Sequence, residues 1–502
     1  MSTAADSGPG WRRLHRRTVL VTALVTAGVA AGAAVPVTVA LSGRLGYAEA
    51  IGWVLAGAAL LIGCATAGDY VRWRRTRYRV GAERVELHTG LLLVKRRSLA
   101  RERIRSVDLT AHPLLRILGL VSVRIGTGEN TGGDSTLELD PVTRAEGERL
   151  RRELLDRAAS GSSGTRRDGE LATLDLRWVR YAPVSFVAPM LGGAAAGGVM
   201  QVSDWAGAQA EVIHWVADRF RDTPLVWAIV TLVVAVLAAG VIGALGLWIE
   251  MWWNYRLERE PGGTLRVRRG LLTARSLSVE ERRLRGVDLV EPLGVRLAGA
   301  ARVDAITTGL AKNEEARSAD HNTLLPAVPR TLADTVAAEV LREPVSPTGA
   351  PLTGHPLAAR SRRLRRALSV ALAPVLVQVV LGVLLTPVLL WTALACAVVS
   401  LPVAVLLALD AYRSLGHTLT GGYLVTRSGS VRRSTAALQR AGVIGWTVKQ
   451  SWFQRRAGLL SVTATTAAGG GAYTAHDTDA TEGLGFAADA VPGLLEPFLD
   501  RD

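Results

Sequence analysis

The apolar residues of this chain are concentrated in six long stretches that come in three pairs. Each stretch is close to the ~20 apolar residues that a helix needs to cross the hydrocarbon core of a bilayer. The pairs are 18–41 with 49–71, 182–202 with 224–249, and 367–386 with 388–409. A short turn joins the first pair, and only the region of Pro387 interrupts the third. This pattern predicts six transmembrane helices arranged as three hairpins.

Arginines lie mainly on one side of this predicted topology. They cluster before the first, third and fifth spans and after the second, whereas the opposite turns hold few that are not balanced by aspartates. By the positive-inside rule, both termini and the segments that follow each hairpin lie in the cytosol. The formal charge of +15 therefore fits a multi-pass membrane protein. Nucleic-acid binding is disfavoured, because the arginines sort by membrane side and lack interleaved stacking aromatics.

The span interiors hold almost no ionisable residues, which argues against ion transport. The loop 203–223 between the third and fourth spans contains several large apolar residues. It predicts a short helix on the outer membrane surface, with a partly ordered loop as the alternative.

A motif of glycine and arginine occurs three times, each time after a predicted hairpin. An arginine follows the first glycine after 26 residues, and a second glycine follows after three more. The first glycines are Gly90, Gly270 and Gly429, the arginines are Arg116, Arg296 and Arg455, and the second glycines are Gly119, Gly299 and Gly458. This spacing indicates one folded unit used three times. We expect the arginines to bond backbone carbonyls at a turn, and the glycines to supply backbone angles that other residues avoid.

Each copy contains short alternating stretches separated by turn residues and ends in an amphipathic stretch. The strands predicted after the second glycine are 121–125, 302–306 and 461–465, polar loops follow at 129–135, 312–322 and 469–482, and the closing helices are 143–158, 330–342 and 486–499. Units of this kind are typical of a small barrel or sandwich capped by a helix. The chain is thus an α+β membrane protein divided into a basic tail (1–17), hairpin 1 (18–71), domain 1 (72–158), a linker (159–181), hairpin 2 (182–250), domain 2 (251–342), a linker (343–366), hairpin 3 (367–410) and domain 3 (411–502).

Basic residues of the first two copies form a candidate binding patch. Its members are Lys95, Arg96, Arg97, Arg103, Arg105, Arg268, Arg269, Arg283 and Arg285. Near an anionic leaflet each surface cation contributes about 1 kcal/mol, so the patch is a candidate for lipid headgroups or for an acidic partner. The alternative is a solvated strand face that merely follows the positive-inside pattern.

Motifs for catalysis or for a cofactor are not found in the sequence. Hydrolase and metalloprotease signatures are missing, and the glycine-rich run 126–133 lacks the Lys-Ser/Thr of a phosphate loop. His476, Asp477 and Asp479 lie in a glycine-rich stretch, and we expect them to face solvent rather than to bind a metal. We therefore predict no enzymatic activity, no cofactor and no metal site.

The repeated pattern resembles the bacterial pleckstrin-homology-like domain membrane proteins of the YdbS/YdbT type. The resemblance rests on a Tyr or His separated from the first glycine by eleven residues and on the arginine–glycine pair, and residues 448–462 match best. It implies three pleckstrin-homology-like (PH-like) domains, each a seven-stranded, partly open barrel closed by a C-terminal helix, and it implies no catalytic residues. The third copy departs from the pattern, since Thr447 replaces the aspartate of Asp108 and Asp288.

We expect a non-enzymatic protein of the bacterial cytoplasmic (inner) membrane that presents three cytosolic PH-like domains as a scaffold. Its expected partners are membrane lipids and another membrane or cytosolic protein, and its expected role is envelope maintenance. The three modules are predicted to pack with approximate threefold symmetry. The alternative is a transporter or lipid-handling protein that uses a groove between the hairpins.

Overall fold

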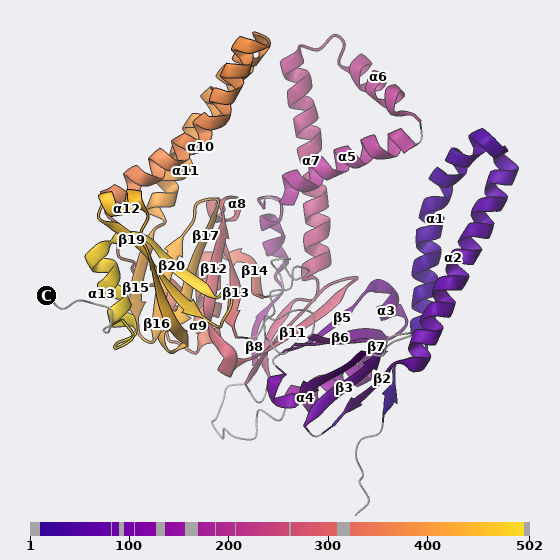
Figure 1. Ribbon diagram of the computed structural model, residues 1–502, viewed down its shortest axis with the longest axis horizontal. Helices are drawn as coiled ribbons and strands as arrows, with labels where there is room; N and C mark the ends of the chain where they lie inside the picture. Colours follow the sequence, from indigo (N-terminus) through magenta and orange to yellow (C-terminus); the bar gives the residue numbers. More distant parts are fainter. Residues whose placement is uncertain are drawn as a thin grey trace, which may run out of the picture. The chain divides into compact units, whose positions relative to one another are not determined.

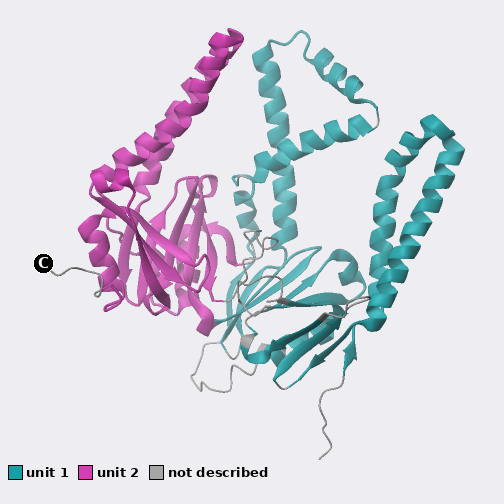
Figure 2. Ribbon diagram, viewed as in Figure 1, with its two compact units in different colours: residues 1–280, 311–317 teal, residues 281–310, 318–502 magenta. Residues whose placement is uncertain are grey.

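The computed structural model describes residues 11–81, 83–89, 95–104, 106–126, 136–155, 169–185, 187–205, 207–260, 263–308 and 322–495. The chain forms two compact units, which we describe separately (Figure 2). Unit 1 comprises residues 1–280 and 311–317, and unit 2 comprises residues 281–310 and 318–502. The boundary therefore falls inside the second of the three repeats.

Five helices in the described part of the chain are long and apolar enough to cross a membrane. They are α1 (Thr18–Leu45), α2 (Tyr47–Arg75) and α7 (Leu225–Trp252) in unit 1, and α10 (Leu357–Leu384) and α11 (Val388–Arg413) in unit 2. The first two pack as a hairpin, and so do the last two (Figure 1). The break near Pro387 lies where the sequence predicts it, between α10 and α11.

The predicted span 182–202 differs from the other five. Its residues form the helix α5 (Val187–Trp205), but α5 is not one of the five helices that are long and apolar enough to cross a membrane. Glycine and alanine supply much of α5, and they contribute little apolar surface. The helix nevertheless packs against α7 and crosses it obliquely (Figure 1). The short helix expected in the loop 203–223 is α6 (Gln209–Arg219).

The first repeat is a sandwich of two antiparallel sheets with a helix. One sheet holds β1 (Arg12–Arg13), β2 (Arg77–Val80), β3 (Arg84–Thr89) and β4 (Lys95–Ala100) in that order. The other begins with β7 (Thr136–Thr143), β6 (Leu120–Gly126) and β5 (Ser106–Ala111). Val85, Val107, Val123 and Leu150 are fully or almost fully buried in one shared core, and Leu150 belongs to the closing helix α4 (Arg144–Leu155).

Consecutive repeats share β-sheets. In unit 1, β5 of the first repeat pairs with a strand of the second, so the sheet continues as β11 (Ala274–Glu280), β10 (Thr264–Arg269), β9 (Arg256–Glu260) and β8 (Gly169–Thr173). In unit 2, the second repeat's β14 (Thr323–Pro329), β13 (Ala300–Thr307) and β12 (Leu284–Pro292) continue into the third repeat's β17 (Arg432–Gln439), β16 (Tyr423–Ser428) and β15 (Gly416–Thr420). The last sheet holds β18 (Val443–Lys449), β19 (Leu459–Thr466) and β20 (Ala472–Asp479).

This sharing corrects the expectation of three separate seven-stranded barrels. In the described part of each repeat, six of its strands fall into two groups of three, and the two groups belong to different sheets. A barrel would need the last strand of the first group to pair with the first strand of the second group, for example β4 with β5 or β11 with β12. The following repeat occupies that edge of β5 and β12 instead, so no barrel closes among the described residues.

Each repeat also contains a short helix and a closing helix. The short ones are α3 (Pro113–Ile117), α8 (Leu293–Leu297) and α12 (Trp452–Arg456), and the remaining closing helices are α9 (Arg330–Leu341) and α13 (Ala480–Ala490). The prediction 486–499 for the last was wrong by six residues at its start, and the expected loop 469–482 contains all of β20. The Asp479 side chain accepts hydrogen bonds from the backbone N–H groups of Thr481 and Glu482, which starts the helix early. The polar loops predicted at 129–135 and 312–322 lie almost wholly outside the described residues.

Candidate functional site

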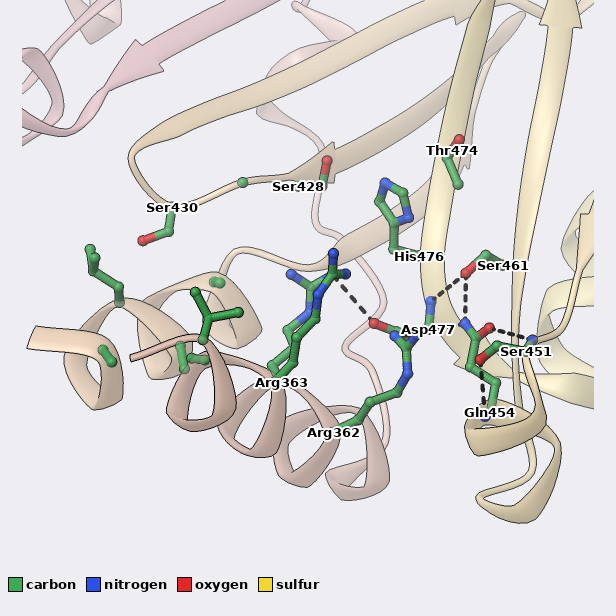
Figure 3. A pocket seen from close by; sticks show the side chains of 18 of the residues that line it. Arg362, Arg363, Ser428, Ser430, Ser451, Gln454, Ser461, Thr474, His476 and Asp477 are labelled. Carbon is green, nitrogen blue, oxygen red and sulfur yellow. Dashed lines mark hydrogen bonds and ion pairs between the residues drawn. The ribbon is translucent and has the colours of Figure 1, made fainter. Parts of the chain in front are cut away.

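One candidate site is a cavity of about 1180 Å³ in unit 2, which we call the arginine cavity. Its wall comes from α10 and α11 on one side and from β18, β19 and β20 on the other (Figure 3). The turn after β16 and the start of α12 complete it. The hairpin is therefore part of the site together with the third repeat.

Local capping places one polar side chain at the base of the cavity. The Ser451 hydroxyl accepts a hydrogen bond from the backbone N–H of Gln454, and the Gln454 side chain accepts one from the N–H of Ser451. This capping box begins α12 and fixes the direction of Gln454. The Gln454 amide then donates to Asp477 Oδ1 and to the Ser461 hydroxyl, both at 2.9 Å.

Asp477 is the centre of the polar network in Figure 3. The residue is only 2% exposed, although it lies on a strand near the protein surface. Its Oδ1 accepts a hydrogen bond from Arg362 Nη1, and Arg363 Nη2 lies 3.4 Å from its Oδ2. The expectation that Asp477 faces solvent is therefore wrong. The cause is α10, whose first turns pack through Ala359 against Leu415 and Leu459 and so bring both arginines to the strand.

The cavity has a cationic end and an apolar side. Arg366 and Lys449 join Arg362 and Arg363, so four basic side chains face a single carboxylate among the lining residues. Arg366 and Lys449 are exposed, and neither has an ion pair among the described residues. The apolar side consists of residues from both helices of the hairpin, namely Ala367, Val370, Ala371, Val403, Ala404 and Leu407.

Two buried polar atoms of the wall have no hydrogen-bond partner among the described residues. They are Nε of Arg363 and the hydroxyl oxygen of Ser400. Buried polar groups are nearly always paired in native structures, because an unpaired one costs about 1–3 kcal/mol. The cavity therefore offers unsatisfied donors to a ligand with acceptor oxygens.

A pair of buried histidines lies behind the network. His355 Nδ1 is 3.2 Å from the backbone oxygen of Asp477, and its Nε2 is 3.1 Å from Nδ1 of His417. Nε2 of His417 lies 3.7 Å from the Glu482 carboxylate. Burial, and secondly the neighbouring His417, lower the pKa of His355 to about 4, so the ring is neutral at physiological pH.

The basic residues expected from the sequence to form a patch are distributed over both units. Arg96 is exposed and Arg97 is half-buried on β4. Arg105 and the side chains of Lys95 and Arg103 are outside the part of the chain that the structure describes. Arg268 and Arg269 line a second cavity of about 400 Å³ in unit 1, where Arg269 stacks on Trp252 at 4.4 Å. Arg283 is buried and Arg285 half-buried in unit 2.

The repeated arginines lie at corresponding positions but have different partners. Arg116 donates to the backbone carbonyl of Leu271, and Arg296 Nη2 lies 2.7 Å from the carboxylate of Asp410. Arg455 is exposed and has no partner among the described residues.

Two of the repeated glycines are required by their turns. Gly270 and Gly429 have φ of 111° and 101°, and an added Cβ would lie 1.9–2.0 Å from a carbonyl oxygen. The second glycines also have positive φ, at 70°, 70° and 63° for Gly119, Gly299 and Gly458. Gly90 lies outside the described residues.

Sequence reasoning used the cavity arginines only as markers of membrane side. Arg362, Arg363 and Arg366 are spaced so that they lie within about one turn of the same helix, directly before an apolar run. That arrangement is a signal for a site at the membrane surface. Asp477 carries no comparable signal, because its burial depends on contacts with residues more than 100 positions away.

Comparison with known proteins agrees with the repeat pattern. The family model described as "Bacterial PH domain" matches three times, at residues 27–158, 210–344 and 367–484. The chain is also similar to the UPF0699 transmembrane protein YdbT of Bacillus subtilis (strain 168), with 20% identity over 424 residues, or 79% of this chain and 80% of that protein. No solved structure matches the chain. The resemblance identified from the sequence is confirmed.

Proposed function

This chain belongs to the bacterial PH domain family, and we propose that it is a non-enzymatic scaffold of the bacterial cytoplasmic (inner) membrane that binds an anionic phospholipid in the arginine cavity. In this proposal α5 and the five other candidate spans form three hairpins, both termini lie in the cytosol, and three PH-like repeats face the inner leaflet. A role in envelope maintenance and a second protein partner belong to the same proposal.

One observation carries the proposal, namely that one cavity combines four basic side chains with an apolar side on two helices long and apolar enough to cross a membrane. A phospholipid has the complementary chemistry, with an anionic phosphate beside an acyl chain. Arginine fits a phosphate well, because its planar group donates two parallel hydrogen bonds to the phosphate oxygens. Arg366 and Lys449 are available for such contacts, since neither has an ion pair among the described residues.

The contacts in the cavity favour binding over catalysis. The Asp477 carboxylate is already held by Arg362 and by the Gln454 amide, so it is poorly placed to act as a general base. Among the described residues there is also no group of three His, Cys, Asp or Glu side chains able to hold a metal ion.

The test measures binding of the purified full-length protein to vesicles of phosphatidylcholine with and without phosphatidylglycerol. We expect Arg366→Gln and Lys449→Gln each to weaken retention of phosphatidylglycerol about fivefold, which corresponds to about 1 kcal/mol per cation. The matched control is Arg360→Gln, since Arg360 is exposed on the same helix but does not line the cavity. Equal retention by all three variants would contradict the proposal.

A lipid-handling protein is the second candidate, because apolar residues of both helices, Val370 on α10 and Val403 on α11, line the cavity. A protein that moves lipids should transfer a labelled phospholipid between vesicles, whereas a scaffold should only retain it. Transfer that is abolished by Arg366→Gln would favour this second function.

A further inference from the structure

The two junctions between consecutive repeats are built in the same register. Positions are counted here from the first glycine of each repeat, that is, from Gly90, Gly270 or Gly429. At both junctions, position 4 of the later repeat faces position 21 of the earlier repeat. At the first junction the facing pairs are Ala274 with Ala111, Arg275 with Thr110, and Ser276 with Leu109. At the second they are Arg433 with Glu291, Ser434 with Val290, and Thr435 with Leu289. The junction is therefore a property of the repeat and not of one pair of sequences.

Two strands that correspond to junction strands lack a junction partner among the described residues, namely β4 in the first repeat and β18 in the third. β4 in the first repeat corresponds to β11 and β17, and β18 in the third corresponds to β5 and β12. Within the described residues β4 pairs only with β3, and β18 pairs only with β19. Each strand therefore has an open edge at the place where its counterparts have a partner. Open edges of this kind are ready templates for pairing with another chain.

Side-chain exposure at β18 agrees with a missing neighbour. Leu109 and Leu289 are 7% and 0% exposed in the completed junctions, whereas Val448 at the corresponding position is 42% exposed. Ile444 on the same strand is 64% exposed. At the Val448 position the open strand thus exposes an apolar side chain that its counterparts bury.

The repeated arginine marks the same incomplete junction. Arg116 of the first repeat bonds the carbonyl of Leu271, directly after the glycine of the second repeat. Arg296 of the second repeat bonds Asp410, and Asp410 also accepts from Ser430, directly after the glycine of the third. Arg116 therefore contacts the glycine turn of the following repeat, and Arg296 contacts Asp410, which is hydrogen-bonded to the glycine turn of the following repeat. Arg455 of the third repeat is exposed, and its side chain has no partner among the described residues.

We propose that β18 of one copy pairs antiparallel with β4 of a second copy, so that the protein assembles head to tail along the membrane. The internal register places Val448 opposite Arg96, Thr447 opposite Arg97, and Trp446 opposite Ser98. In the same register Arg455 of the first copy lies beside the Lys95 end of β4 in the second. Because the two surfaces differ, the contact is heterologous and generates rings or open chains.

The same register places Lys95 opposite Lys449, and like charges that face each other across two strands destabilise the pair. The contact between copies is therefore weaker than the second internal junction, where Arg433 faces Glu291. The assembly depends on protein density in the membrane for this reason.

Disulfide trapping in native membranes tests the proposal. Cys64 and Cys396 are replaced by serine, and two differently tagged full-length copies are co-expressed, one with Arg97→Cys and the other with Thr447→Cys. We expect a disulfide-linked dimer that carries both tags. Ile444→Cys is the matched control for Thr447→Cys, since Ile444 is exposed on the same strand but lies about 10 Å out of register.

Two further variants separate the contact from a general effect on folding. Lys95→Glu should raise the yield of the trapped dimer several-fold, because it places opposite charges at the facing positions. Arg455→Ala should lower the yield several-fold, while Arg456→Ala, which removes a side chain stacked on Trp452, should not. The thermal unfolding temperature of each variant shows whether the fold is kept.

Equal trapping of Thr447→Cys and Ile444→Cys would overturn the proposal. A disulfide that forms only when both cysteines are in one chain would overturn it as well, and so would an Arg455→Ala variant that folds normally and traps at the original yield.

Discussion

At the scale of single residues, Asp477 holds two arginines of the arginine cavity in place. The carboxylate is 2% exposed and is shared between Arg362, Arg363 and the Gln454 amide. A buried ion pair is costly to break from one side, because the remaining charge keeps its desolvation penalty. The residue thus couples the stability of the third repeat to the charge of the cavity.

Asp477→Asn should change stability and ligand binding in opposite directions. We expect unit 2 to lose about 3 kcal/mol of unfolding free energy, since two guanidinium groups lose their counter-charge. Retention of phosphatidylglycerol should rise, because the same groups become available to a phosphate. Thermal unfolding and vesicle binding measure the two effects. Asp489→Asn is the control, as Asp489 is exposed, and parallel changes in both variants would contradict the prediction.

The buried histidine pair predicts a dependence of stability on pH. The pKa of His355 is lowered to about 4 by burial and by His417, while the unfolded chain has the ordinary value of 6.5. Between these values the unfolded state binds more protons, so the unfolding free energy falls as pH decreases from about 6.5 to 4, by up to about 1.4 kcal/mol per pH unit. Above this range the contribution is constant.

The check compares the unfolding midpoint of the native protein with that of His355→Gln from pH 7.5 to 4.5. The variant should be less stable at pH 7.5 but should lose less stability on acidification. Glu482 remains in both proteins, whereas His417 lies 3.1 Å from His355 and loses that partner in the variant, so His417→Gln and the double variant are measured alongside. A constant difference between the two proteins across the range would show that His355 does not titrate in this way.

At the scale of elements, the packing of α5 on α7 depends on small residues. A Cβ at Gly240 would lie 2.0 Å from the carbonyl oxygen of Ala188, and one at Gly192 would lie 2.2 Å from that of Val236. The two backbones therefore approach as closely as glycine allows, which is how helices commonly associate in membranes. This contact holds α5 against α7, although α5 is less apolar than the other helices.

Gly240→Ala should separate these helices and destabilise unit 1 by about 1–3 kcal/mol, the usual cost of overpacking. Gly246→Ala on the same helix is the control, since nothing lies within 4 Å of the added Cβ. Thermal unfolding in mild detergent measures both variants. If they unfold at the same temperature, the contact between α5 and α7 is not a significant source of stability.

The elements that the sequence predicted well are those with a strong local pattern. The strands 121–125, 302–306 and 461–465 appear as β6, β13 and β19, and α9 begins at Arg330 as expected. The strands β1 and β8 were missed, because two to five residues of basic tail or linker have no periodicity and become strands only by pairing with β2 and β9. The cavity was missed for a similar reason, since it joins α10 to β20 across more than 100 residues.

At the scale of the whole molecule, the topology is the premise of the proposed function. Reporter fusions after residues 80, 260 and 420 should all report a cytosolic location, because arginines flank the hairpins on that side. A fusion in α6, for example after Ala217, should report the opposite side. A cytosolic signal at Ala217 would remove α5 or α7 from the set of spans, and an external signal at any of the other three would contradict the proposed orientation.

The shared sheets also determine when each strand can pair while the chain is being synthesised. β5 is complete when residue 111 leaves the ribosome, but its second partner begins at Ala274, roughly 160 residues later. At the 5–20 residues per second of translation, that edge stays unpaired for about 10–30 s while a further pair of helices is made. The same interval recurs between β12 and β17. We therefore expect the nascent chain to need protection of each edge during this interval, and slowing translation after residue 111 should increase aggregation of the newly made protein.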